Sequence, residues 1–231
     1  MSLILNIDTA QETAQLSLAE NGEVLMGIDN AEQKEHAAFV QPAVQTLFSK
    51  TRRSMHSLSA VAISQGPGSY TGLRVGMASA KGICYALNIP LIGVGTLEIM
   101  AYGAQKQVQD VDLWCPMIDA RRQEVYVALF DNHLNAVLPP QAMVLDKTSL
   151  SDFTKNHRIL FSGNGSIKWE KIIVQDHNHN HCIFKNILID FYSLANLSHD
   201  YFLRKQFINL AYAEPLYLKD FHHSPANLKT Q

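Results

Sequence analysis

A glycine-rich turn between an apolar segment and a long helical pattern constrains the fold of this chain more than any other feature. Residues 60–63 predict a buried strand, and the pattern of residues 71–88 predicts a helix. Between them Gly66 and Gly68 flank Pro67, and glycine permits a positive φ and the close approach of a second backbone. A helix N-terminus after such a turn attracts anions, but the spacing matches neither a P-loop nor a dinucleotide-binding turn. The sequence therefore leaves a tight structural turn and a phosphate loop both open.

The composition is that of a globular protein. Of its 231 residues, 47% are hydrophobic and 17% charged, which is ample material for a packed core. With a net charge of −2 the chain lacks the excess of basic residues typical of a stand-alone nucleic-acid binder. Contact with RNA would therefore need a local basic patch or a basic partner. Three cysteines without C-x-x-C spacing favour reduced thiols. Asp8 interrupts the first apolar stretch, so we expect a strand there, neither a signal peptide nor a membrane span, and a cytoplasmic protein.

The hydrophobic pattern predicts an α/β chain. The expected strands are 3–7, 14–18, 24–28, 60–63, 90–94, 113–119, 125–130, 158–162 and 215–218, and the expected helices are 35–50, 71–88, 96–105 and 194–207. Thr71 is the expected N-cap of the second helix, and Ser193 that of the last one.

Two apolar strands end in the same dipeptide. Ile7-Asp8 and Ile118-Asp119 lie about 110 residues apart, which indicates a duplicated unit. We therefore expect two lobes, an N-terminal lobe over residues 1–105 with the partner-binding helices and a reduced C-terminal lobe over residues 106–231.

Several separate motifs stand out along the chain. They are Ile7-Asp8-Thr9, the string from Gly66 to Gly76, Asp119-Ala120-Arg121-Arg122-Gln123-Glu124-Val125-Tyr126, Gly163-Asn164-Gly165 and Pro215-Leu216-Tyr217-Leu218-Lys219. Together they resemble the motifs of the TsaB (YeaZ) family of bacterial tRNA-modification proteins. The residues that match the family's loops are Asp8, Thr9, Gly66, Pro67, Gly68, Ser69, Tyr70, Thr71, Arg74, Asp119 and Arg121. Tyr70 stands where the family often has Phe, Asn164 where it often has Asp, and residues 131–212 resemble the family only weakly.

The resemblance implies a fold and a role. The fold is the actin-like/Hsp70-like (RNase H-like) α/β fold of duplicated βββαβα lobes. The role is that of a non-catalytic partner in making N6-threonylcarbamoyladenosine at position 37 of ANN-decoding tRNAs. The implied partners are a TsaD-like catalytic subunit and a TsaE-like ATPase, with a homodimer when the chain is alone. ATP and a metal ion are implied for those partners only, and tRNA is reached indirectly through the complex.

The residues themselves argue against ATP or metal chemistry in this chain. The first hairpin, residues 8–13, lacks the glycine that would let its backbone wrap a phosphate. The metalloprotease alternative lacks paired histidines, because Val40 stands one turn after His36. His177, His179 and His181 read as a solvated loop or as an adventitious metal site. The main alternative is an actin-fold ATPase or sugar-kinase-like phosphotransferase, with Asp8 and the glycine turn near phosphate.

The first two helices are the candidate partner surface. Gly72, Gly76 and Ala80 form an i,i+4 row, and helical glycines cost about 1 kcal/mol each relative to alanine, so close helix approach would explain them. The predicted interface consists of Phe39, Val40, Ala43, Leu47, Gly72, Leu73, Gly76, Met77, Ala80 and Tyr85. Packing of the row on the lobe's own sheet remains the alternative.

Overall fold

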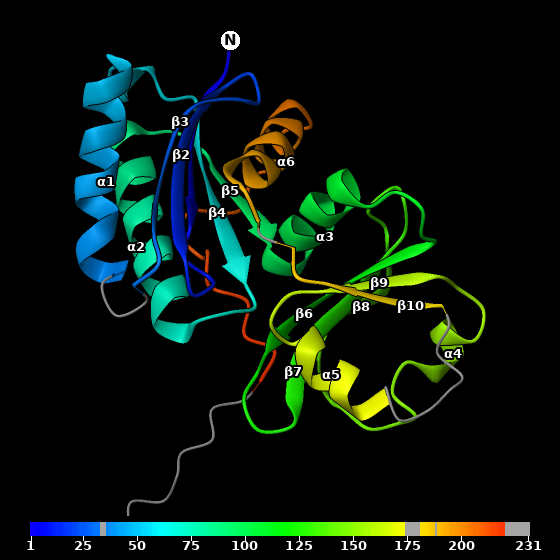
Figure 1. Cartoon of the computed structure of the whole chain (residues 1–231). Coiled ribbons are helices and arrows are strands. Elements are labelled where there is room, and N and C mark those ends of the chain that lie inside the picture. The colour runs from blue at the N-terminus through cyan, green and yellow to red at the C-terminus, as the bar shows by residue number, and fades with distance from the viewer. Residues whose placement is uncertain (33–35, 174–180, 188, 220–231) are drawn as a thin grey trace, which may run out of the picture.

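Two five-stranded sheets form the framework of the molecule. The computed structural model describes residues 1–32, 36–173, 181–187 and 189–219. Figure 1 shows the two sheets in separate lobes, with helix α3 between them. In the part of the chain that the structure describes, no helix is long and apolar enough to cross a membrane.

The first sheet has the strand order β3-β2-β1-β4-β5. Its elements are β1 (Leu3–Asp8), β2 (Ala14–Glu20), β3 (Glu23–Asn30), α1 (His36–Thr51), the short 3-10 helix η2 (Met55–Ser57), β4 (Ala60–Gly66), α2 (Tyr70–Leu87) and β5 (Leu91–Gly95). The first three strands pair antiparallel, and β4 pairs parallel with both β1 and β5. Helices α1 and α2 lie side by side on one face of this sheet (Figure 1).

The second sheet repeats this topology in the order β10-β9-β6-β7-β8. Its elements are β6 (Leu113–Asp119), β7 (Glu124–Phe130), β8 (Ala136–Val144), α4 (Ser151–Thr154), β9 (Ile159–Ser162), α5 (Ser166–Ile173) and β10 (Cys182–Lys185). Strand β6 corresponds to β1, so Asp8 and Asp119 end equivalent central strands. The predicted duplication is confirmed. Helices α4 and α5 of the second lobe are shorter than their counterparts α1 and α2 in the first.

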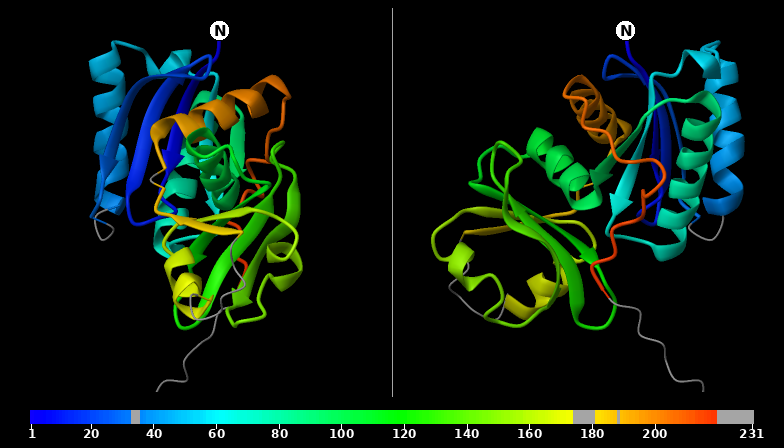
Figure 2. Two further views of the ribbon diagram at one scale, coloured as in Figure 1. Left: turned by 45° about the vertical axis from the view of Figure 1, so that its right-hand side comes forward. Right: turned by 180° about the vertical axis from the view of Figure 1, so that it is seen from behind.

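Two helices connect the lobes. Helix α3 (Thr96–Gln107) places Leu97 and Ala101 against the core of the second sheet and Ile99 against the first. Helix α6 (Phe191–Leu203) returns to the first sheet, where Leu194 and Leu197 pack on the face opposite α1 and α2 (Figures 1 and 2). The expected division at residue 105 places α6 in the second lobe, whereas its apolar face is buried on the first sheet.

Several local predictions need correction. Ser69, rather than Thr71, caps α2, because its hydroxyl accepts from Gly72 N. Asp190, rather than Ser193, caps α6. Residues 215–218 form no strand, and β8 and β10 were not expected.

Candidate functional site

The glycine turn packs against the turn that follows β1. Ser69 N donates to Ala10 O over 2.6 Å, and the Thr9 hydroxyl donates to Gly72 O over 2.7 Å. A Cβ at Gly68 would overlap Ala10 O, and one at Gly72 would overlap Thr9 O. The two glycines are therefore required by contact with another backbone of the same lobe. A phosphate bound at this turn would need free backbone amides. Ser69 N already donates to Ala10 O, and Gly72 N already donates to the Ser69 hydroxyl.

Asp8 lies in a nearly closed environment beside this turn. The residue is 5% exposed, and its carboxylate accepts a hydrogen bond from Ala10 N over 3.0 Å. The cavity next to it is also bounded by Asn6, Asp190 and Leu194 and has a volume of about 10 Å³. That is space for about one water molecule. The N-terminus of α6 thus bounds the small cavity beside Asp8.

The second hairpin, between β6 and β7, is a cationic turn. Asp119 accepts a hydrogen bond from Arg121 N over 2.6 Å and pairs with Lys168 Nζ at 2.5 Å. Burial would raise the pKa of Asp119, but these hydrogen bonds and the charges of Lys168 and Arg121 outweigh it and lower the pKa. Arg121 and Arg122 both have positive φ, 66° and 54°. The left-handed region costs a non-glycine residue roughly 1–2 kcal/mol, so the turn holds both arginines at an energetic cost.

Residues 208–219, here called the strap, run from the first lobe to the second (Figure 2). Leu216 N donates to Gln65 O over 2.7 Å beside the glycine turn. At the other end Lys219 Nζ donates to Ala120 O over 3.1 Å and forms an ion pair with Glu124. The strap therefore ties the loop after β4 to the hairpin after β6. Only the motif of residues 215–219 signalled it in the sequence.

Tyrosine side chains mark where the strap meets α2. The rings of Tyr70 and Tyr217 lie 5.4 Å apart, and they are 41% and 38% exposed. Arg74 donates to the Tyr70 hydroxyl over 2.6 Å, and its guanidinium lies 4.8 Å from the centre of that ring. These family-motif residues form a surface rather than a closed pocket.

Most of the predicted interface residues lie inside the first lobe. The buried ones are Val40, Ala43, Leu47, Gly72, Leu73, Gly76, Met77 and Ala80, while Phe39 is half-buried and Tyr85 is 84% exposed. A Cβ at Gly76 would overlap the Thr9 hydroxyl. The small-residue row thus packs on the lobe's own sheet, and its buried members cannot contact a partner.

A different face of the two helices is open to solvent. We define the helix face by the exposed residues Ala37, Ala38, Gln41, Pro42, Gln45, Ser49, Thr71, Arg74, Ala78, Gly82, Tyr85 and Ala86. Arg74 is the single charge among these residues, and Lys50 is a further exposed charge in the last turn of α1. A Cβ at Gly82 would meet nothing within 4 Å. Soluble surfaces are ordinarily about a quarter or more charged, so this face is unusual.

The histidines for which the sequence left an adventitious metal site open lie mostly outside the described residues. His177 and His179 lie outside them, the side chain of His36 is likewise not described, and His181 is exposed. Within the part of the chain that the structure covers, no cluster of three or more His, Cys, Asp or Glu side chains is placed to hold a metal ion.

Comparison with known proteins adds sequence and fold relationships. The family model for TsaD, tRNA N6-adenosine threonylcarbamoyltransferase, matches residues 29–201. The tRNA threonylcarbamoyladenosine biosynthesis protein TsaB of Bacillus subtilis is 31% identical over 173 residues, covering 74% of both chains. TsaB of Escherichia coli is 35% identical over 134 residues, covering 58% of this chain and 57% of its own.

Solved structures show the same architecture. A Pseudomonas aeruginosa protein similar to the peptidase YeaZ superposes with a TM-score of 0.81 at 21% identity, covering 95% of this chain and all of its own. An activator of 2-hydroxyisocaproyl-CoA dehydratase from Clostridium difficile has a TM-score of 0.51 at 9% identity, covering 89% and 96%. At these identities both likenesses show the fold alone, and they support the predicted actin-like duplicated lobes. On the sequence matches, this chain belongs to the TsaB (YeaZ) family of tRNA threonylcarbamoyladenosine biosynthesis proteins.

Proposed function

We propose that this chain is a non-catalytic partner subunit in the transfer of threonylcarbamoyl to N6 of adenosine 37 in tRNA. Its role is to hold a TsaD-like catalytic subunit through the helix face. That face carries the proposal, because it is exposed, contiguous over two packed helices and almost free of charge. Protein interfaces are depleted of charged residues at their centres.

Gly82 supports this assignment within the helix face. Glycine in a helix interior costs about 1 kcal/mol relative to alanine, and no contact within the described structure accounts for it. Ala78 and Ala86 lie one turn before and after it on the same face. Small side chains allow a second helix to approach closely. If two copies of this chain pair through the same face, homodimer and heterodimer would exclude each other.

The geometry around Asp8 supports a role without phosphate chemistry in this chain. The turn amides already have acceptors within the lobe, and α6 fills the space beside the carboxylate. ATP and its metal ion are accordingly assigned to the partner subunits, namely the TsaD-like subunit and a TsaE-like ATPase.

Reconstitution tests the function directly. Threonylcarbamoyl transfer from its adenylate to an ANN-decoding tRNA is measured with the two partner subunits, ATP and Mg²⁺, with and without this chain. We expect product only when the chain is present and no product from the chain alone. Transfer at the full rate without the chain contradicts the proposal, as does transfer catalysed by the chain by itself.

A further inference from the structure

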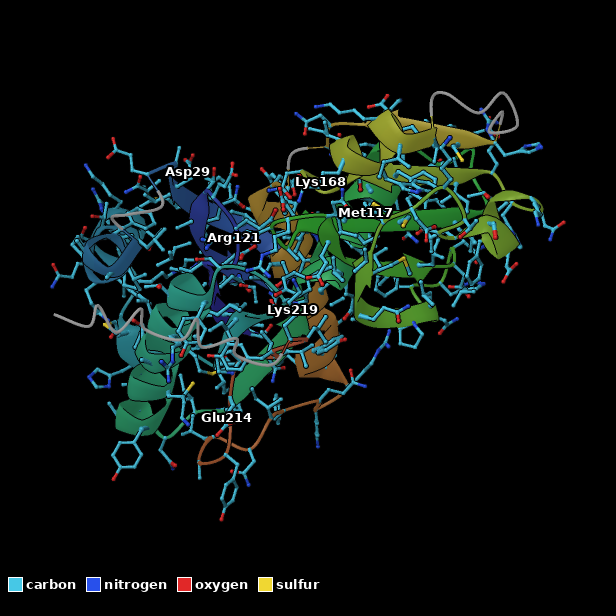
Figure 3. All side chains as sticks on the ribbon, turned by 90° about the horizontal axis from the view of Figure 1, so that it is seen from below. Asp29, Met117, Arg121, Lys168, Glu214 and Lys219 are labelled. Atoms are coloured by element: carbon cyan, nitrogen blue, oxygen red, sulfur yellow. The ribbon has the colours of Figure 1, made fainter. Side chains whose placement is uncertain are left out.

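Four cationic side chains lie close together where the two lobes meet. We call Arg121, Arg122, Lys168 and Lys219 the basic patch. Lys219 Nζ donates to Ala120 O, the residue before Arg121, and two residues earlier in the strap the ring of Tyr217 lies beside that of Tyr70. Lys168 Nζ donates to Arg122 O over 2.8 Å. Figure 3 shows Arg121, Lys168 and Lys219 together on the side of the molecule where the lobes meet.

The patch concentrates positive charge on a chain whose net charge is −2. Its two carboxylates, Asp119 and Glu124, already pair with Lys168 and Lys219. Among the described residues, neither Arg121 nor Arg122 forms an ion pair within 4.0 Å, although the charge of Arg121 acts on Asp119, and both arginines are exposed. Burial and the charge of Arg122 lower the pKa of Lys219. The cations thus repel one another, and an anion bound here would relieve that repulsion.

The backbone of the turn determines how the two arginines are presented. Both arginines occupy the left-handed region, which glycine, asparagine or aspartate adopts with less strain. The turn presents two adjacent guanidiniums, a group that binds phosphate oxygens in a bidentate manner.

The exposed rings decide between RNA and an acidic protein as the occupant. Tyr70 and Tyr217 lie between Arg74 and the cationic turn, and each exposes more than a third of its surface. Single-stranded RNA is bound by phosphate contacts combined with stacking of bases on aromatic rings. A purely acidic peptide would gain nothing from the rings.

We propose that the basic patch binds the phosphate backbone of RNA directly, with an unpaired base stacked at Tyr70 and Tyr217. This rests on the proposed function and deepens it, because the tRNA would contact this subunit as well as its catalytic partner. It also departs from the expectation that tRNA is reached only indirectly.

The test uses the full chain and a fluorescently labelled ANN-decoding tRNA transcript, with anisotropy measured over a series of salt concentrations. In Arg121→Gly/Arg122→Gly we expect affinity to fall about tenfold. The slope of log affinity against log salt should drop in magnitude by roughly 1.4 to 1.8, since each of the two lost phosphate contacts removes about 0.7–0.9. Thermal unfolding of this variant should move to higher temperature, because glycine relieves the turn. Tyr217→Leu should weaken binding without changing the slope.

The matched control is Lys50→Gln/Arg52→Gly. Arg52 is also exposed and left-handed, with a φ of 54°, and α1 ends at the opposite end of the first sheet from the turn after β4 (Figure 1). This control removes the same charge and should bind tRNA like wild type. The inference is overturned if wild type does not bind tRNA at low salt, or if the patch variant binds like wild type. It is equally overturned if the control loses as much tRNA affinity as the patch variant. The same holds if the patch variant keeps its tRNA affinity and loses only its binding to the TsaD-like subunit. Sedimentation of wild type mixed with the TsaD-like subunit measures complex formation, and so tests the proposed function independently of tRNA binding.

Discussion

Gly72 lies with its backbone directly against the carbonyl of Thr9, and the Thr9 hydroxyl donates back to Gly72 O over 2.7 Å. This reciprocal contact joins the start of α2 to the turn after β1. It explains why a glycine row that resembles a helix-pairing motif is buried in the monomer. The row is part of the core, and we therefore propose that a partner binds on the opposite side of α2.

The first prediction follows from that separation of faces. Gly76→Leu should destabilise the chain by about 1–3 kcal/mol or more, because its side chain would enter the space of the Thr9 hydroxyl and Ile63. Gly82→Ala should stabilise it by about 1 kcal/mol, since the new methyl group meets open space. Urea unfolding followed by circular dichroism measures both. Equal stabilities for the two variants would contradict this assignment of buried and exposed faces.

Gly66 is predicted to be intolerant of any side chain. Its φ of 118° is in a region that L-residues rarely adopt, and a Cβ would lie 2.7 Å from Leu216 O in the strap. Gly66→Ala should therefore lower the free energy of unfolding by about 1–3 kcal/mol and loosen the strap. Hydrogen exchange at Leu216 N, which bonds Gln65 O, reports the second effect. Unchanged protection of that amide would show that the strap is held independently of the turn.

Replacing Asp8 should have little effect on threonylcarbamoyl transfer by the reconstituted complex. Its carboxylate accepts a hydrogen bond from Ala10 N and faces a cavity that holds about one water. We expect Asp8→Asn, in the reconstituted reaction, to retain more transfer activity than a variant that disrupts the helix face. Loss of all activity by Asp8→Asn with partner binding intact would require a chemical role for this residue.

The buried thiols predict a pH dependence in the alkaline range. Burial raises the pKa of Cys84 to about 11, above its ordinary value of 9.0. Between these values the unfolded chain loses the thiol proton first, so the stability contributed by the neutral thiol is complete below about pH 9 and is lost as the pH rises toward 11. The difference in unfolding free energy between wild type and Cys84→Ala should shrink over this window. A difference independent of pH would mean that Cys84 does not titrate with folding.

The sequence predicted the fold because its signals are local. The glycine turn, the alternating first strands and the paired Ile-Asp strand ends each specify a backbone conformation within a few residues. The site was harder to predict, because the row Gly72, Gly76 and Ala80 is equally compatible with a sheet and with a partner helix. Only the position of Thr9, brought close by the pairing of β1 with β4, decides between them.

Contacts between segments far apart in the sequence could likewise not be predicted from a local sequence pattern. Helix α6 has an apolar face that would fit either lobe, and Leu194 and Leu197 reach the first sheet only because the chain passes between the lobes. Ser69 and Thr71 are both competent caps, and the hydrogen bond of Ser69 N to Ala10 O places the helix start at Tyr70. The strap is held by backbone carbonyl acceptors, those of Gln65 in the first lobe and Ala120 in the second. Such contacts leave no periodic hydrophobic pattern in the sequence.

The central claim is that the helix face holds the TsaD-like subunit. It is tested most directly by sedimentation velocity of that subunit mixed with wild type, Gly82→Leu, or Lys171→Leu, an exposed helical position on α5 in the second lobe. We predict a heterodimer with wild type and with Lys171→Leu, and separate species with Gly82→Leu despite its native circular dichroism. A folded Gly82→Leu that forms the heterodimer as well as wild type would place the interface elsewhere and contradict the account.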